Sequence, residues 1–216
     1  MRRSVVFIGY VLVLAFLSGC ATPKDYTAFR QHAPRSVLVL PPLNESLDVK
    51  ATYGVLSTVT RPLSEMGYYV FPVAVIDQFL KENGLPTAGE MHQIPLSKIH
   101  DIIDADAVLY MSVEEYGTKY IILDSSTIVR LNARLVDVET GNLLWDGHVD
   151  VRVSASQNYG GGLIGMLVSA TVNQVVASST DQAHGVAAQA NTQLLTTSGQ
   201  GLLYGPYNPN FGIDGQ

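Results

Sequence analysis

The chain has 216 residues, 47% of them hydrophobic, which is enough for one domain of ordinary size. It carries 13 basic and 19 acidic side chains, and this acidic balance excludes the basic surface with which proteins bind nucleic acid. Cys20 is the only cysteine, so the chain forms no internal disulfide, and no histidine lies at a metal-ligand spacing. We therefore expect no metal site, no cofactor and no catalytic residue.

The first 20 residues have the pattern of a secretory signal peptide. Arg2 and Arg3 precede an apolar run, and Leu17–Cys20 has the sequence Leu-Ser-Gly-Cys, which resembles the bacterial lipobox. This resemblance implies cleavage before Cys20 and attachment of acyl chains such as palmitate to that residue. The alternative is an uncleaved membrane-spanning helix, but the apolar run is shorter than the about 20 residues that a bilayer requires.

The residue after the cysteine bears on the location of the protein. In lipoproteins of enteric-type bacteria an aspartate at this position favours the inner membrane, so Ala21 implies the outer membrane by the same resemblance. Removal of the signal peptide leaves 11 basic and 19 acidic side chains, so the lipid must supply the membrane affinity. Residues 20–35 are polar and contain Pro23 and Pro34, which predicts a lipidated tether.

The next segments alternate between strand and helix patterns. The predicted strands lie at residues 36–40, 68–71 and 107–113, and the predicted helices lie around residues 55–66, 75–80 and 97–103. Gly67 and Asn83–Gly84 are expected to end the first two helices, and Ser97 is expected to cap the third. Such alternation predicts an α/β layer. Val75, Ile76, Phe79 and Leu80 mark the second of these helices, and Ile99, Ile102 and Ile103 are expected to face inward from the third.

Two segments of strict alternation, residues 126–138 and 143–153, predict a long β-hairpin. Gly141 ends the connecting loop in the left-handed region, and Val138 then pairs with Asn142. Counting from this pair places Arg134 opposite Asp146, Asn132 opposite His148, Arg130 opposite Asp150, Leu135 opposite Trp145 and Leu131 opposite Val149. The expected apolar face of the second strand consists of Leu143, Trp145, Val149, Val151 and Val153.

His148 lies between two aspartates on the polar face of this hairpin, at Asp146 and Asp150. Three such side chains could form a weak metal or proton site. The alternation of the strand accounts for the same residues as a solvated polar face.

After the hairpin the pattern changes at Tyr159–Gly162, where the glycines form either a hinge or a phosphate-binding turn. Residues 163–177 have a helical pattern that runs on to about Leu195, and they form either a core helix or a surface for another subunit or a membrane. An aromatic tail follows at residues 198–216, and we expect it to form an interaction surface unless it folds back onto the sheet. The expected interface residues are Tyr159, Leu163, Ile164, Tyr204, Tyr207 and Phe211.

The lipobox and the segments Val37–Ser46, Gly67–Val73 and Ala105–Leu109 resemble a family of bacterial outer-membrane lipoproteins of unknown function. The family's fold is similar to the TolB N-terminal domain and to PelC, an exopolysaccharide-export lipoprotein. Asp137–Trp145 is similar to a hairpin of CsgG, the curli secretion pore, although no obvious pore-forming pair of long hairpins is visible. The resemblance implies a place in an envelope assembly, with a CsgG-like lipoprotein and further copies of the chain as partners.

These observations predict a single α/β domain with a mixed sheet, flanking helices, a long β-hairpin and a C-terminal helix. Its expected parts are a lipoprotein signal peptide (1–19), a lipidated tether (20–35), the α/β domain (36–197) and the aromatic tail (198–216). The expected function is that of a non-enzymatic assembly or accessory component of an envelope or secretion complex, anchored by lipid to the periplasmic face of the outer membrane. The alternative is an envelope ligand-binding protein, or an enzyme with an unrecognised site.

Overall fold

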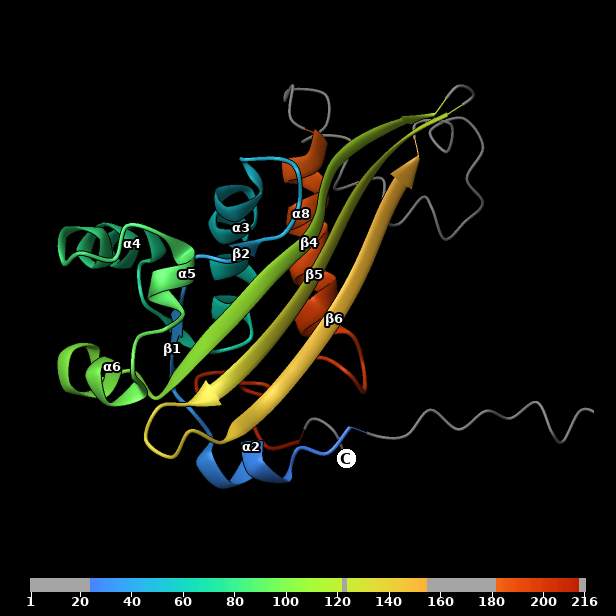
Figure 1. Ribbon diagram of the computed structural model, residues 1–216. Coiled ribbons are helices and arrows are strands. Elements are labelled where there is room, and N and C mark those ends of the chain that lie inside the picture. Colours follow the sequence, from blue (N-terminus) through green and yellow to red (C-terminus); the bar gives the residue numbers. More distant parts are fainter. Residues whose placement is uncertain (1–23, 122–123, 155–181, 214–216) are drawn as a thin grey trace, which may run out of the picture.

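The computed structural model describes residues 24–121, 124–154 and 182–213, which fold around one mixed sheet (Figure 1). The described helices are α2 (Thr27–His32), α3 (Ala51–Glu65), α4 (Val73–Glu82), α5 (Ala88–Met91), α6 (Leu96–Ile103) and α8 (Gln182–Thr196). The strands are β1 (Ser36–Val39), β2 (Leu43–Asn44), β3 (Tyr69–Val70), β4 (Ala107–Ile121), β5 (Asp124–Asp137) and β6 (Leu143–Ser154).

The sheet has the order β3-β1-β4-β5-β6, with β2 paired to β4. Its first strands run parallel, whereas β4, β5 and β6 are antiparallel neighbours. The predicted fold class, a single α/β domain with a mixed sheet and flanking helices, is confirmed.

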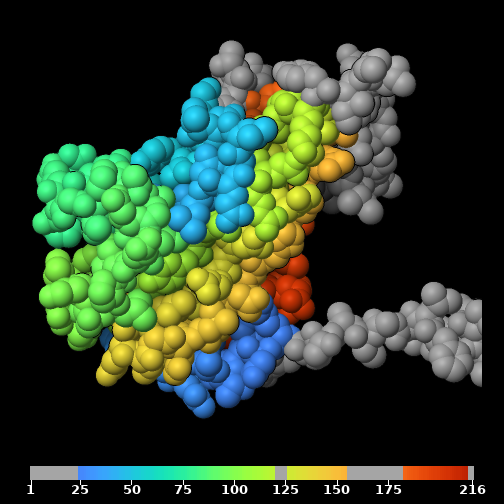
Figure 2. Space-filling view, viewed as in Figure 1, coloured from blue at the N-terminus to red at the C-terminus, as the bar shows by residue number. Residues whose placement is uncertain are grey.

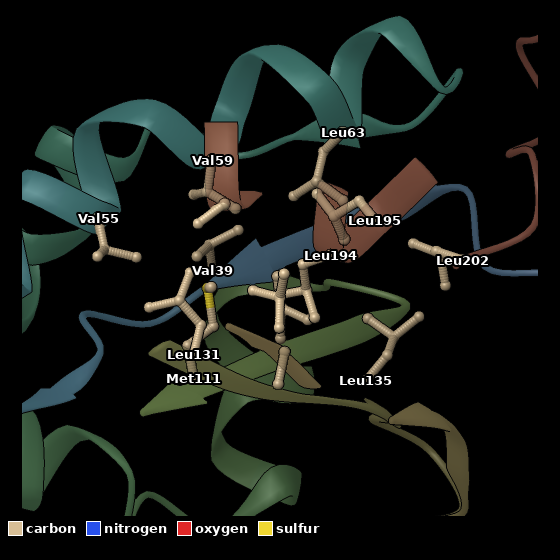
Figure 3. Close-up of a cluster of buried hydrophobic side chains, with 14 of the residues drawn as sticks. Val39, Val55, Val59, Leu63, Met111, Leu131, Leu135, Leu194, Leu195 and Leu202 are labelled. Atoms are coloured by element: carbon tan, nitrogen blue, oxygen red, sulfur yellow. The ribbon is translucent and has the colours of Figure 1, made fainter. Parts of the chain in front are cut away.

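Helices α3 and α8 cover one face of the sheet (Figures 1 and 3). From α3, Val55, Val59 and Leu63 point at the strands at helical spacing, and all three are completely buried. Asn191 of α8 is buried among them, and its amide donates hydrogen bonds to the carbonyl of Val55 at 3.0 Å and to the hydroxyl of Thr58 at 2.9 Å. The buried polar group thus links the two covering helices.

Helices α4, α5 and α6 pack on the opposite face, over β1 and the first part of β4. These three helices form a second helical layer, and strand β1 is therefore buried on both faces. Val37 and Val39 pack in the cluster that contains α3, and Leu38 packs against the second layer. Burial on both sides explains its uninterrupted apolar sequence, which is typical of parallel strands. The second layer does not extend over β6, whose polar side chains Asp146, His148 and Asp150 are exposed.

The predicted hairpin register is confirmed over most of β5 and β6. Arg134 lies opposite Asp146, Asn132 opposite His148, Arg130 opposite Asp150, Leu135 opposite Trp145 and Leu131 opposite Val149. The expected pairing of Val138 with Asn142 is wrong, because a bulge shifts the register so that the Asp137 N–H donates to the carbonyl of Asn142 at 2.9 Å.

The bulge changes which leucine of β6 is buried. Leu144 and Trp145 are both buried, although they are consecutive, and Leu143 is half exposed. The expected inward orientation of Leu143 is therefore wrong, and Val153 at the far end of the strand is also exposed. One inserted residue reverses the alternation of the whole segment beyond it.

Strand β4 is longer than predicted and pairs with β5 as far as Ile121, so the sheet contains a second long hairpin. Its register shifts between Val113 and Glu115, and the residues beyond that point are largely polar. The irregularity interrupts the apolar pattern, so the sequence predicts a strand only over residues 107–113.

The second helical layer also differs from the expectation. Ile102 is 62% exposed, so its predicted inward orientation is wrong. On the helix before it, Val75 is 64% exposed and Phe79 is 37% exposed. Helix α6 begins after Pro95, and Ser97 lies within it rather than at its cap. These helices contact the sheet along one narrow side only, which leaves the remaining apolar side chains at the surface.

Residues on both sides of the predicted domain pack against it. In the segment expected to be a tether, Phe29 of α2 is 2% exposed and Tyr26 is buried. In the segment expected to be a tail, Leu202 and Leu203 are buried, and the Gly205 N–H donates to the carbonyl of Met66 at 2.9 Å. The structure therefore includes parts of the segments 20–35 and 198–216 in the packed body.

Candidate interaction groove

An apolar groove of about 510 Å³ opens between α4, α5 and α6. In Figure 2 these helices form the two lobes at the left of the molecule, with a depression between them. The lining residues are Phe79, Leu80, Asn83, Leu85, Glu90, Gln93, Ile94, Pro95, Lys98, Ile99, Ile102 and Ile103. The volume lies within the range of sites that bind small ligands or the side chains of a partner.

The groove exists because its two long walls carry more apolar residues than the core can accept. On α4, Leu80 is buried against the sheet, while Phe79 next to it extends into the groove. On α6, Ile99 is 1% exposed and Ile102 is 62% exposed. Contiguous exposed apolar surface of this kind marks an interaction site more often than isolated exposed residues do.

The rim of the groove carries two opposite charges with different surroundings. The carboxylate of Glu90 accepts hydrogen bonds from the Thr87 N–H at 3.0 Å and the Thr87 hydroxyl at 2.8 Å, and so caps α5. Lys98 of α6 forms no ion pair with any residue that the structure describes. The rim therefore offers an ammonium group to an anionic partner.

His92 follows α5 and links it to the sheet. Its Nε2 donates a hydrogen bond to the carbonyl of Pro41 at 2.9 Å, and its ring lies edge-on to Tyr110 at 5.3 Å between centroids. Burial lowers the pKa of His92, and the nearby Arg134 acts in the same direction. The imidazole thus connects the turn between α5 and α6 to the segment that follows β1.

Four predicted site residues, Cys20, Tyr159, Leu163 and Ile164, lie outside the described residues. The three aromatic residues of the tail lie in the packed body or on its surface, away from the groove lining. Tyr204 is partly buried, and Tyr207 and Phe211 are exposed. No sequence motif predicts the groove. The only indication in the sequence is that α4 and α6 carry more apolar residues than one buried face of a helix needs.

The polar face of the hairpin has the character of a solvated surface. Arg130 pairs with Asp150 at 2.7 Å and lowers the pKa of that carboxyl, whereas Lys24 pairs with Asp146 at 3.1 Å. His148 is bonded to Asn132 at 2.7 Å. Each of the three groups has its own partner, and no cluster of His, Cys, Asp or Glu in the described ranges could hold a metal ion.

The chain is similar to proteins named as lipoproteins. The family model "Putative lipoprotein GNA1162-like" matches residues 24–207. The Neisseria meningitidis serogroup B protein named "Putative lipoprotein NMB1124/NMB1162" is 48% identical over 206 residues, which are 93% of this chain and 95% of that protein.

The chain is also similar to solved structures. The crystal structure of lipoprotein GNA1162 from Neisseria meningitidis is 52% identical and has a TM-score of 0.56; it matches 67% of this chain and 100% of that one. A PelC dodecamer from Paraburkholderia phytofirmans is 15% identical with a TM-score of 0.43, over 84% of this chain and 95% of that one. No helix within the described residues is long and apolar enough to cross a membrane.

Proposed function

The chain belongs to the GNA1162-like family of lipoproteins, and we propose that it is a lipid-anchored accessory protein of the outer membrane that acts by protein contact rather than catalysis. The observation that carries this proposal is the apolar groove with Phe79 and Ile102 at its surface. We propose that an apolar segment of an envelope protein occupies it from the periplasmic side. The names of the relatives as lipoproteins support the anchoring part of the proposal.

Anchoring at Cys20 would hold the domain close to the bilayer. Four residues after Cys20, the ammonium of Lys24 pairs with Asp146 on the sheet. A chain of four residues spans at most about 14 Å. The end of the molecule that carries α2 would therefore face the membrane, and the distal ends of β4 and β5, at the opposite end in Figure 1, would point away from it.

We expect the Cys20→Ser protein to be lost from the outer-membrane fraction, because the acyl chains would have no attachment site. Fractionation and mass spectrometry of the mature protein measure this change, and Thr22→Ser serves as a control with a substitution near the same site. A Cys20→Ser protein that stays in the outer membrane with the mass of the lipidated form would contradict the proposed anchor.

The groove is tested by a charge introduced at an exposed apolar position. We expect Ile102→Glu to reduce, at least about tenfold, the yield of envelope proteins that crosslink to the wild-type groove. The reason is that burial of an unpaired carboxylate in an apolar contact is unfavourable. Val75→Glu is the matched control, since Val75 is an equally exposed aliphatic residue of α4 that does not line the groove. Neither substitution should lower the melting temperature, because both side chains are exposed.

The experiment uses the full-length lipoprotein in intact cells, with crosslinked products identified by mass spectrometry. We expect the wild type and Val75→Glu to recover the same envelope proteins, and we expect Ile102→Glu not to recover them. Identical crosslinks for Ile102→Glu and Val75→Glu would show that the groove is not the contact site.

A further inference from the structure

We infer that the segment that occupies the groove is residues 45–49 of a second copy of this chain. The inference rests on the proposed function and identifies the partner of the same groove. Its basis is a surface loop that presents two aliphatic side chains and one carboxylate in a fixed arrangement, matched in chemistry to the groove and its rim.

The loop between β2 and α3, residues 45–49, alternates between exposed and half-buried side chains. Leu47 is fully exposed and Val49 is 88% exposed, and Glu45 is exposed with them. Ser46 and Asp48, between them, are only partly exposed. Two aliphatic side chains so completely in water are the kind of group that gains free energy by burial against another apolar surface.

Hydrogen bonds within the loop fix this arrangement. Asn44 accepts the Ser46 N–H at 2.9 Å and donates to the carbonyl of Asp48 at 2.8 Å. The Asp48 carboxylate accepts the Lys50 N–H at 2.9 Å, and the Glu45 N–H donates to the carbonyl of Val113 on β4 at 2.9 Å. A loop that is ordered before binding loses little conformational entropy when it docks.

The loop does not line its own groove. Its backbone is attached to β4 through Glu45 and leads directly into α3 at Ala51, while the groove is bounded by α4, α5 and α6. The two surfaces occupy separate regions in Figure 2: the loop lies near the upper centre, and the lobes of the groove lie at the left. A contact between them therefore joins two copies.

The charges beside the two surfaces are complementary. Glu45, beside the exposed aliphatic pair, and Lys98, on the rim of the groove, each form no ion pair within the described parts of the chain. With Leu47 in the groove of a second copy, we expect this carboxylate to face that ammonium. Such a pair at the edge of an interface favours one orientation of docking over others.

A contact between two different surfaces is head-to-tail. Each copy then keeps one free loop and one free groove, so association continues until the copies close into a ring or extend as a chain. Copies anchored in one membrane leaflet share the same orientation to the bilayer, which favours closure around an axis perpendicular to it.

Engineered cysteines test this contact directly in the full-length lipoprotein in cells. A chain with Leu47→Cys and Ile102→Cys together should form a disulfide-linked ladder of multimers under mild oxidation. Cells that contain separate Leu47→Cys and Ile102→Cys copies should form one mixed dimer. The single variants alone should stay monomeric, because the contact joins unlike surfaces.

Charge reversal gives a second measurement, by sedimentation of the purified lipoprotein in detergent. We expect Glu45→Lys and Lys98→Glu each to weaken self-association at least about threefold. The double variant, Glu45→Lys with Lys98→Glu, should restore it, since the pair is then present with its signs exchanged.

Three outcomes would overturn the inference: absence of the ladder, dimers formed by either single cysteine variant, or no recovery in the double charge variant. If Ile102→Glu also removes envelope crosslinks, the groove binds a different protein and the proposed function stands without this partner. If Ile102→Glu has no effect on crosslinks either, both the inference and the proposed function fail.

Discussion

Replacing Trp145 by alanine is expected to lower the free energy of unfolding by about 3–5 kcal/mol. The indole is 1% exposed and is the largest fully buried side chain. Its Nε1 donates a hydrogen bond to the carbonyl of Gln200 at 3.0 Å. Its ring fills the space above Gly147, where a β-carbon would lie 2.4 Å from the indole. Alanine would leave both a cavity and an unpaired carbonyl.

Unfolding in urea, followed by circular dichroism, measures this loss with the Cys20→Ser chain as the parent. Tryptophan fluorescence is unsuitable, because Trp145 is the only tryptophan. Two neighbours provide controls for the bulge: Leu144→Ala should cost about 2–5 kcal/mol, whereas Leu143→Ala should change stability by less than about 0.5 kcal/mol. A larger cost at Leu143 than at Leu144 would contradict the observed register.

Gly67→Ala is expected to destabilise the protein by about 2–4 kcal/mol and to release the tail from the domain. Gly67 has a φ of +89°, which strains any residue with a β-carbon, and that carbon would lie 2.3 Å from the backbone nitrogen of Asn208. Its carbonyl also accepts the Tyr207 N–H at 3.1 Å. The substitution therefore acts on the turn and on the tail that packs against it.

Gly84→Ala separates these two effects. Gly84 has a similar φ of +86°, and no atom lies within 4 Å of the position of a β-carbon. It should show only the backbone strain of about 1–2 kcal/mol. Equilibrium unfolding gives the two costs, and limited proteolysis after residue 200 reports the release of the tail. Equal costs and equal proteolysis for the two variants would show that the tail does not depend on Gly67.

The sequence predicts a strand or a register correctly where the burial of each side chain follows from its place in a regular apolar pattern. The apolar run of β1 and the alternation around Arg130 and Asp150 predicted a buried strand and a hairpin register, because burial on two faces and burial on one face leave different patterns. The bulge at Leu144 leaves no comparable pattern in the sequence, since either Leu143 or Leu144 fits an apolar face. Only packing against Trp145 and its neighbours selects one of them.

The groove was harder to predict for a related reason. Periodicity shows that Phe79 and Ile102 are apolar residues of helices, but it does not show how far a second layer covers them. One part was readable: Thr87 and Glu90 have the spacing of a capping box, which would have predicted α5. The arrangement of three short helices around an open apolar surface depends on tertiary packing and is not encoded in any one segment.

The attachment of the tail to Met66 and to Tyr26 has a consequence for the proposed export to the outer membrane. Tyr26 donates its hydroxyl hydrogen bond to the carbonyl of Gly201, so residues near the two ends of the chain complete each other's packing. A chain that crosses the inner membrane from its N-terminus delivers α8 and the tail last. The first strands must then wait, with their apolar faces exposed, until nearly the whole chain has crossed. For the periplasmic location proposed above, we therefore expect the chain to need protection by a chaperone until α8 and the tail have crossed.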